Sequence, residues 1–274
     1  MPMTAGTGSV YVRKALGRRL KELRVAARKS HADVGDVGSI AKIKRIEAGD
    51  PPIKMPDVRA LCFMYGADTA TTEQLAEMAL IKEENWWEDY PEAVPHWLGK
   101  YVALETAASA ITTFDPELIH GLLQTPAYHR AVFEADADVV SANVELEIGF
   151  RAERQRAAFG RTPPLRVTAV LGEGALVRAV GGDATMREQR LHLMKMSEQR
   201  HVDVFVLPWV AGAHTSMKGA FTILSTDNPE EPDVVYLETL GGGRYMERQD
   251  LVERYRRNAE IIKSQSVTMK EYLS

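Results

Sequence analysis

The sequence predicts an α+β protein in two domains: a five-helix N-terminal domain over residues 10–82 and, after a connector at 83–98, a C-terminal α+β domain with a small mixed sheet over residues 99–274. In the first part of the chain, apolar residues recur every three or four positions, which is the period of helices that bury one face. In the second part, helical stretches are followed by short apolar runs rich in β-branched residues, which are typical of strands.

The charge of the chain differs between the two parts. Residues 1–70 contain 13 Lys plus Arg and 7 Asp plus Glu, a net charge of +6, whereas the remaining residues contain 21 basic and 31 acidic side chains, a net charge of −10. A basic domain can hold a polyanion by releasing its counterions, and an acidic domain repels one. The N-terminal domain is therefore the candidate for binding nucleic acid.

The composition favours an intracellular protein. The length of 274 residues suits one small and one medium domain. Cys62 is the only cysteine and has apolar neighbours, so we expect a buried thiol and no disulfide within the chain. The chain has no signal-peptide pattern at its start and no apolar run of about 18 residues, so we expect a cytoplasmic protein that does not enter a membrane.

The first helix is predicted from an amphipathic pattern that begins at Val12. Its apolar positions recur at helical spacing: Val12, Leu16, Leu20, Leu23 and Ala27. Its opposite face is basic, with Arg13, Arg18, Arg19, Lys21 and Arg28. Two short helices are expected between residues 30 and 48, a fourth from Pro56 to Gly66, and a fifth over about residues 72–82.

Residues 39–49 have the pattern of a DNA-recognition helix. Ile43 and Ile46 lie three positions apart and can face a core. On this helix Lys42, Lys44 and Arg45 are expected to point outward. Gly49 follows the helix and supplies a residue that adopts the left-handed conformation of a helix end. A short cationic helix that is closed by glycine is suited to lie in the major groove of DNA.

Residues 12–75 resemble the helix-turn-helix of XRE-type, Cro/phage-repressor-like regulators. Ser30-His31-Ala32-Asp33-Val34-Gly35 stands where such domains carry a Thr/Ser-Gln-x-x-[LV]-Ala run, which places His31 at the position of a Gln that contacts a phosphate. The resemblance also implies a buried ion pair between Arg24 and Glu47, which would tie the first helix to the recognition helix.

The sequence departs from that pattern in the turn and at the start of the recognition helix. The starts of the second and third helices are slightly closer in sequence than is usual. Gly35 and Gly38 weaken the second helix by about 1 kcal/mol each. Ile40 and Ala41 stand where polar base-reading residues are common. The predicted DNA-binding residues are His31, Ser39, Ile40, Ala41, Lys42, Lys44 and Arg45, and Arg45 is expected to pair with guanine as the strongest contact.

The C-terminal domain is predicted to contain helices over residues 101–112, 126–133, 141–159, 185–200 and 251–263, and strands over 165–171, 202–207, 220–225 and 234–240. Gly241-Gly242-Gly243 is interpreted as a turn, because no phosphate-binding motif accompanies it. Arg151, Arg154 and Arg156 are interpreted as the solvated side of the third of these helices, and an anion site is the alternative.

Three segments extend the resemblance over nearly the whole chain. Residues 114–128 are similar to an E-x-x-x-G-L-L-Q-T-x-x-Y segment, residues 207–214 to L-P-x-x-A-G-A-H, and residues 235–238 to V-Y-L-E. These segments occur in a domain of unknown function that follows XRE domains in actinobacterial-type regulators. The resemblance implies a transcriptional regulator, often paired with a small acidic partner protein, and it implies no known ligand or reaction.

The same three segments predict a small-molecule site in the C-terminal domain. Its residues would be Gln124, Tyr128, Arg151, His214, Tyr236 and Glu238. An alternative is that Gln124 and Glu238 satisfy buried backbone groups and that His214 caps a turn. An acid–base pair of His214 with Glu238 is only weakly indicated, and the histidines lack metal-ligand spacing, so we expect neither a cofactor nor a metal site.

Two hypotheses for the function follow. The first is a DNA-binding transcriptional regulator, a homodimer on double-stranded DNA, that is gated by a small-molecule effector or a partner protein through its C-terminal domain. The second is an enzyme or small-molecule-binding protein that keeps a degenerate helix-turn-helix as a scaffold. Affinity for duplex DNA that falls with salt distinguishes them, because only the first requires it.

Overall fold

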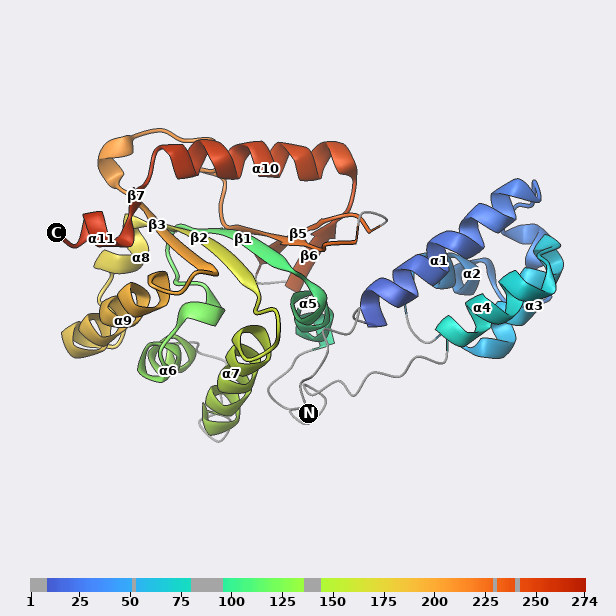
Figure 1. Ribbon diagram of the computed structural model, residues 1–274, viewed down its shortest axis with the longest axis horizontal. Coiled ribbons are helices and arrows are strands. Elements are labelled where there is room, and N and C mark those ends of the chain that lie inside the picture. Colours follow the sequence, from blue (N-terminus) through green and yellow to red (C-terminus); the bar gives the residue numbers. More distant parts are fainter. Residues whose placement is uncertain (1–8, 51–52, 80–95, 136–143, 229–230, 240–241) are drawn as a thin grey trace. The chain divides into compact units, whose positions relative to one another are not determined.

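The computed structural model describes residues 9–50, 53–79, 96–135, 144–228, 231–239 and 242–274. They form two compact units, an N-terminal unit up to residue 79 and a C-terminal unit from residue 96 (Figure 1). The predicted α+β class is confirmed, with helices alone in the first unit and a mixed sheet in the second. The predicted connector at 83–98 lies almost wholly outside the described residues, so the predicted domain boundaries stay a prediction.

The N-terminal unit contains five helical segments: α1 (Ser9–Ala26), the 3-10 turn η1 (Ala32–Val34), α2 (Ile40–Glu47), α3 (Met55–Tyr65) and α4 (Thr69–Met78). The second predicted helix is therefore a single turn, which agrees with the low helix propensity of Gly35 and Gly38 around it. Fully buried side chains of four segments form one core, among them Leu16, Leu20, Val34, Ile43, Ile46, Val58, Leu61 and Cys62. Cys62 is buried as expected, and burial raises the pKa of its thiol.

Polar side chains and glycines end the helices of this unit where the sequence indicates. The Ser39 hydroxyl accepts a hydrogen bond from the Lys42 backbone N–H and caps α2. Gly49, at φ 77°, and Gly66, at φ 73°, follow α2 and α3 in the left-handed region, as predicted. Asp68 caps α4 through the Thr71 N–H, so α4 begins at Thr69, a little before the predicted start.

The C-terminal unit is built on a seven-stranded mixed sheet in the order β6-β5-β4-β1-β2-β3-β7. Its strands are β1 (Ala110–Asp115), β2 (Arg166–Gly172), β3 (Val202–Leu207), β4 (Phe221–Ser225), β5 (Val234–Thr239), β6 (Gly242–Met246) and β7 (Val267–Thr268). The pairs β1–β2 and β2–β3 are parallel and the other pairs are antiparallel. Four predicted strands correspond to β2, β3, β4 and β5.

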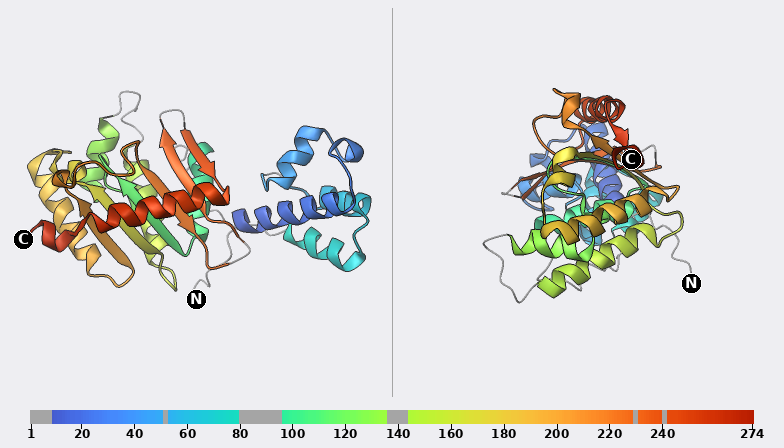
Figure 2. Two further views of the ribbon diagram at one scale, coloured as in Figure 1. Left: turned by 90° about the horizontal axis from the view of Figure 1, so that it is seen from above. Right: turned by 90° about the vertical axis from the view of Figure 1, so that its left-hand side faces the viewer.

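Helices cover the two faces of the sheet unequally (Figures 1 and 2). One face carries α5 (His96–Ala107), α6 (Pro126–Glu134), α7 (Val144–Phe159) and α9 (Gly182–Ser197). The other carries α10 (Gln249–Ser264). We call these the α7 face and the α10 face. The short helices α8 (Glu173–Val177) and α11 (Met269–Tyr272) and the 3-10 turns η3 (Gly121–Leu123) and η5 (Trp209–Ala211) lie in connections.

Two sequence interpretations of this unit are wrong. The predicted helix over 101–112 ends at Ala107, and Ala110–Asp115 is a strand that pairs with β2 on one side and β4 on the other. Pairing on both edges outweighs the helical propensity of the alanines before Ile111. The glycines after β5 do not form only a turn, because Gly242 and Gly243 begin β6.

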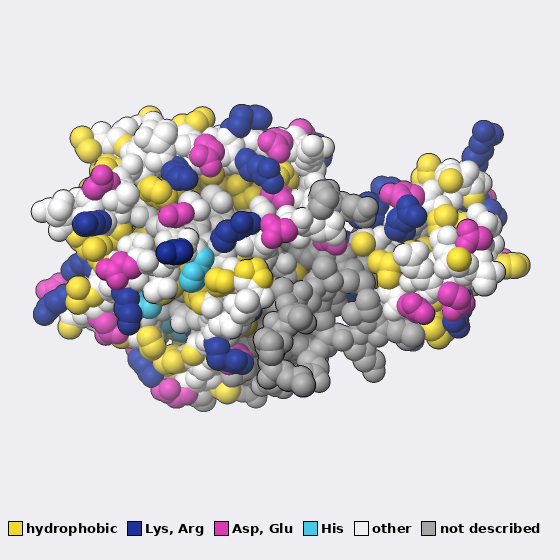
Figure 3. All heavy atoms as spheres, viewed as in Figure 1, with side chains coloured by type: hydrophobic (Ala, Val, Ile, Leu, Met, Phe, Trp, Pro, Cys, Tyr) yellow, Lys and Arg dark blue, Asp and Glu magenta, His cyan; other side chains and the backbone are white. Residues whose placement is uncertain are grey.

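The surface shown in Figure 3 carries intermingled basic and acidic side chains over the C-terminal unit. In the part of the chain that the structure describes, no helix is long and apolar enough to span a membrane.

Candidate DNA-reading helix and ligand site

Helix α2 is fixed to the N-terminal unit by its inner face. Ile43 and Ile46 are fully buried in the core. The glycine at position 17 of α1 lets the two backbones touch, because a Cβ there would lie 2.6 Å from the Glu47 carbonyl oxygen and 2.7 Å from that of Ile46. The end of α2 is therefore held directly against α1, and its outer face is left exposed.

A buried ion pair ties the same end of α2 to α1. Arg24 Nε donates to Glu47 Oε1 at 2.6 Å and Arg24 Nη2 donates to Glu47 Oε2 at 2.9 Å, which confirms the predicted pair. Burial alone would raise the pKa of Glu47, but hydrogen bonds from Arg24 and His31 outweigh it and lower the pKa. This two-pronged geometry fixes the direction of α2 as well as its position.

His31 and Lys42 were predicted to contact DNA, but both side chains bind other residues of the N-terminal unit. His31 Nε2 lies 3.0 Å from Glu47 Oε2. Lys42 Nζ donates to the Val37 carbonyl at 3.1 Å and to Asp57 Oδ1 at 2.8 Å. The Lys42 ammonium is thus engaged between the turn before α2 and the start of α3, and the expectation that it points outward is corrected.

The remaining predicted residues form one exposed face of α2. Ser39, Ile40, Ala41, Lys44 and Arg45 are all exposed. Positions 40 and 41 lie four residues before positions 44 and 45, so these side chains are neighbours on one side of the helix. Neither Lys44 nor Arg45 makes an ion pair with another described residue. This face is available to a polyanion, and its binding of DNA stays a prediction.

In the C-terminal unit, two arginines of α7 point inward, contrary to their interpretation as solvated residues. Arg154 is buried, and its Nε and Nη2 donate to Glu105 Oε1 and Oε2 at 2.5 and 2.6 Å. Arg151 Nη2 lies 3.4 Å from His129 Nδ1, and burial lowers the pKa of Arg151 to about 10. Arg156 alone is exposed.

Gly121 makes room for these arginines, since a Cβ at this position would overlap the Arg151 guanidinium. The two guanidinium groups also act on the neighbouring imidazole of His120. Burial, followed by the charges of Arg154 and Arg151, lowers the pKa of His120 to about 3, so its ring is neutral at physiological pH. The space beside Gly121 is therefore occupied by a side chain of the protein itself.

Gln124 and Tyr128 hold the loop before α6. Gln124 Nε2 donates to the Ile119 carbonyl at 2.7 Å, and the Tyr128 hydroxyl accepts from the Ile119 N–H at 3.3 Å. Gln189 of α9 binds the same loop through the Thr125 N–H and the Leu123 carbonyl. These contacts correspond to the structural alternative for Gln124, and they leave its Oε1 atom buried without a partner among the described residues.

Tyr236 and Glu238 lie on the α7 face of β5. The Tyr236 ring is 4.5 Å from that of Tyr101 and 5.1 Å from that of Tyr245. Its hydroxyl is buried and finds no partner in the described part of the chain. Glu238 is exposed, and its charge raises the pKa of Arg154 and acts on Arg151 in the same direction. Arg151, Tyr236 and Glu238 are therefore brought to one face of the sheet.

His214 is on the other face, so the single predicted pocket is not formed. Its ring packs edge-on against Phe114 at 5.3 Å, and Phe114 belongs to the core beneath α10. Its Nδ1 accepts from the Ser216 N–H at 3.3 Å, as the turn-capping alternative holds. Successive side chains of a strand point to opposite faces of the sheet. The three sequence segments alone therefore do not tell which of the predicted site residues lie on the same face.

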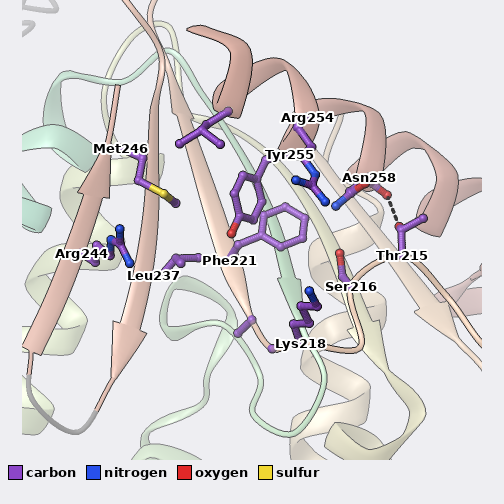
Figure 4. Close-up of a pocket in the computed structure, with 13 residues that line it drawn as sticks. Thr215, Ser216, Lys218, Phe221, Leu237, Arg244, Met246, Arg254, Tyr255 and Asn258 are labelled. Carbon is purple, nitrogen blue, oxygen red and sulfur yellow. Dashed lines mark hydrogen bonds between the residues drawn. The ribbon is translucent and has the colours of Figure 1, made fainter. Parts of the chain in front are cut away.

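A cavity of about 380 Å³ on the α10 face was not predicted (Figure 4). It lies between α10, the strands β4, β5 and β6, and the segment before β4. Three cationic side chains line it: Lys218, Arg244 and Arg254. They come from three different elements, the loop before β4, the strand β6 and the helix α10. The only local signal was the amphipathic spacing of Leu251, Tyr255 and Asn258 on α10.

Comparison with protein families agrees with both units. Residues 98–272 match the model of a domain of unknown function, DUF5753, and residues 15–75 match the model of a helix-turn-helix domain. The predicted combination of a helix-turn-helix domain with an uncharacterised C-terminal domain is thereby confirmed. No curated protein and no solved structure matches the chain.

Proposed function

The chain belongs to the DUF5753 family and has a helix-turn-helix domain before it, and from this premise we propose that it is a transcriptional regulator that reads duplex DNA with α2. The observation that carries the proposal is the exposed face of α2, with Lys44 and Arg45 next to Ile40 and Ala41. A helix-turn-helix domain indicates DNA binding and fits a role in transcription. This role of α2 is also consistent with the predicted cytoplasmic location.

Four side chains of this face match chemical groups of duplex DNA. The planar guanidinium of Arg45 matches the two acceptors of guanine, and the ammonium of Lys44 suits a phosphate. Ile40 and Ala41 are apolar and offer contact to the methyl group of thymine. The departure from the usual polar residues at the start of α2 thus favours a site that contains A·T pairs.

We further propose that the protein acts as a homodimer and that its C-terminal unit receives the regulatory signal. A helix of eight residues reads only a few base pairs, and two such helices on a two-fold axis multiply affinity. The C-terminal unit carries the net negative charge of the chain, so it does not add to the grip on DNA. It is suited to bind an effector or a small acidic partner protein instead.

Selection from a random duplex pool tests the proposal, because such a pool contains every short operator sequence. The bound fraction is sequenced, and affinity for the enriched duplex is measured by fluorescence anisotropy at two salt concentrations. We expect a palindromic motif and an affinity that falls steeply with salt. The double variant Lys44→Ala with Arg45→Ala should select no motif and should lose the salt-dependent affinity. The control Arg257→Ala with Lys263→Ala removes the same charge from α10 and should keep both the motif and the affinity.

Affinity that is independent of salt, or equal in the parent and in the α2 double variant, would contradict the proposal. That outcome would favour the second hypothesis, in which the helix-turn-helix domain is a scaffold for a ligand-binding or catalytic C-terminal unit.

A further inference from the structure

The cavity on the α10 face combines a cationic lining with an apolar floor. Lys218, Arg244 and Arg254 line it, and no Asp or Glu among the described residues does. None of the three cations makes an ion pair with any other residue that the structure describes. Like charges that share a concave surface repel one another, so an anion bound among them would stabilise this lining.

The floor of the cavity is made by side chains of the strands and of α10. Phe221 is buried, and Leu237, Met246 and Tyr255 are packed against the same core. A small inorganic anion would leave these apolar groups uncovered. A ligand with an apolar body removes their surface from water, at about 25 cal/mol for each Å².

A buried hydroxyl in the lining lacks a partner. Ser216 is 4% exposed, and its Oγ atom has no hydrogen bond to the described part of the chain. An unsatisfied buried hydroxyl costs about 1–3 kcal/mol, and an oxygen atom of a ligand would relieve this cost. In the view of Figure 4, Ser216 is drawn between Lys218 and Arg254, whereas Arg244 stands at the other end, beside Leu237.

We propose that this cavity binds a small amphipathic anion, with its acidic head at Lys218, Ser216 and Arg254 and its apolar body over Phe221, Leu237 and Met246. The volume of about 380 Å³ is adequate for such a ligand. The binding site does not depend on DNA binding by the chain. Regulation of α2 by its occupancy rests on the proposed function.

Decanoate is a suitable probe, used below the concentration at which it forms micelles and with the full chain. Isothermal titration calorimetry should show saturable binding to one site per chain. Decanol has the same apolar body without the charge, and inorganic phosphate has charge without the body, so both should bind at least about tenfold more weakly. Decyltrimethylammonium, which inverts the charge, should not bind.

Variants locate the site. Arg254→Met and Lys218→Met should each weaken decanoate binding about tenfold, because each removes a charge-assisted hydrogen bond. Arg257→Met is the matched control, since Arg257 is exposed on α10 and does not line the cavity. Both lining residues are exposed, so the variants should keep the melting temperature of the parent. Met246→Glu, which places an anion on the floor, should also abolish binding.

Equal affinity for decanol and decanoate, equal losses in Arg254→Met and Arg257→Met, or no saturable binding would each overturn the proposal. The DNA experiment above is separate. If the chain binds decanoate and does not bind DNA, the anion site is supported and the proposed function is rejected. If it binds DNA and does not bind decanoate, the proposed function is supported and the anion site is rejected.

Discussion

At the scale of single residues, Asp115 is a carboxyl group whose charge state depends on the fold. It ends β1 and accepts a hydrogen bond from the Thr113 hydroxyl at 2.6 Å. Burial, together with the charge of Glu238 on β5 and against the opposing hydrogen bond of Thr113, raises the pKa of Asp115 to about 7. Among the described residues, the charge of Asp115 also raises the pKa of Tyr101 of α5 and of Tyr128 of α6, both of which are raised mainly by burial.

The raised pKa of Asp115 predicts a stability that falls as pH rises. Below about pH 4 the carboxyl is protonated in both states, and between about pH 4 and pH 7 the unfolded state loses its proton first. Asp115→Asn removes this titration and keeps an acceptor for Thr113. At about pH 8 it should raise the free energy of unfolding by on the order of 2 kcal/mol, and near pH 4 it should change little.

Urea unfolding of parent and variant across this pH range measures the difference. Asp203→Asn, at an exposed position of β3, is the control for loss of a carboxylate from the sheet and is measured over the same pH range. A stabilisation by Asp115→Asn that is the same at low and high pH would show that folding does not raise the pKa of Asp115.

Arg45 and Lys44 are expected to act on DNA in different ways. Arg45→Ala should cost about 1–3 kcal/mol on the selected duplex and relax the preference at one base pair. Lys44→Ala should weaken all duplexes alike and lower the slope of log affinity against log salt by about 1, because it removes one phosphate contact. Anisotropy titrations with the selected and a scrambled duplex separate the two. Identical losses on both duplexes in Arg45→Ala would show that Arg45 contacts only phosphate.

The sequence allowed the role of one buried arginine to be predicted and not that of another. The Arg24–Glu47 pair follows from the resemblance to a known domain, which supplies the position of both partners. Arg154 and Glu105 are 49 residues apart, on helices whose packing no local pattern specifies. An arginine on an amphipathic helix is usually solvated, so only the three-dimensional arrangement shows that Arg154 is buried.

At the scale of elements, the contact of α1 with α2 depends on Gly17. Gly17→Ala should separate the two helices, because its Cβ would lie 2.6 Å from the Glu47 carbonyl oxygen, and neither backbone can move without breaking core contacts. We expect a loss of about 1–3 kcal/mol in stability, despite the better helix propensity of alanine. Thermal unfolding measures this loss, and DNA affinity should fall with it.

Gly35→Ala is the matched control for Gly17→Ala in the same unit. Gly35 has φ −57°, which any residue adopts, and a Cβ there would meet only the Ala32 carbonyl oxygen, at 3.4 Å. This variant should be neutral or slightly stabilising, since it strengthens a short helical turn. A loss in Gly35→Ala as large as that in Gly17→Ala would mean that the close approach of α1 to α2 is not the cause.

The elements that sequence patterns identify best are those with a local signal. The strand β3 alternates between buried and partly exposed residues and ends at Pro208, and α2 has both a capping serine and a closing glycine. The strand β1 has neither, because it follows α5 almost directly and both of its edges are satisfied by strands distant in the sequence. The cavity on the α10 face was missed for the same reason, as its cations belong to three separate elements.

At the scale of the whole molecule, the proposed homodimer predicts the form of the operator. Two copies of α2 on a two-fold axis should contact half-sites about 34 Å apart, one turn of the double helix. Analytical ultracentrifugation at micromolar concentration should therefore show two chains on one palindromic duplex. A duplex with half of the palindrome scrambled is the control and should bind much more weakly. One chain per intact duplex would contradict the dimer.

The hairpin of β5 and β6 belongs to both faces of the sheet at once. Leu237, Arg244 and Met246 line the cavity, whereas Tyr236 packs on Tyr101 at 4.5 Å, and Lys100 lies 4.7 Å from the ring of the intervening Tyr245. The side chains of both faces are attached to the same backbone, so a strand that tilts moves the side chains of both faces. We therefore expect a ligand that shifts this hairpin under α10 to shift its contacts with α5 as well, and α5 is the first described helix of the C-terminal unit.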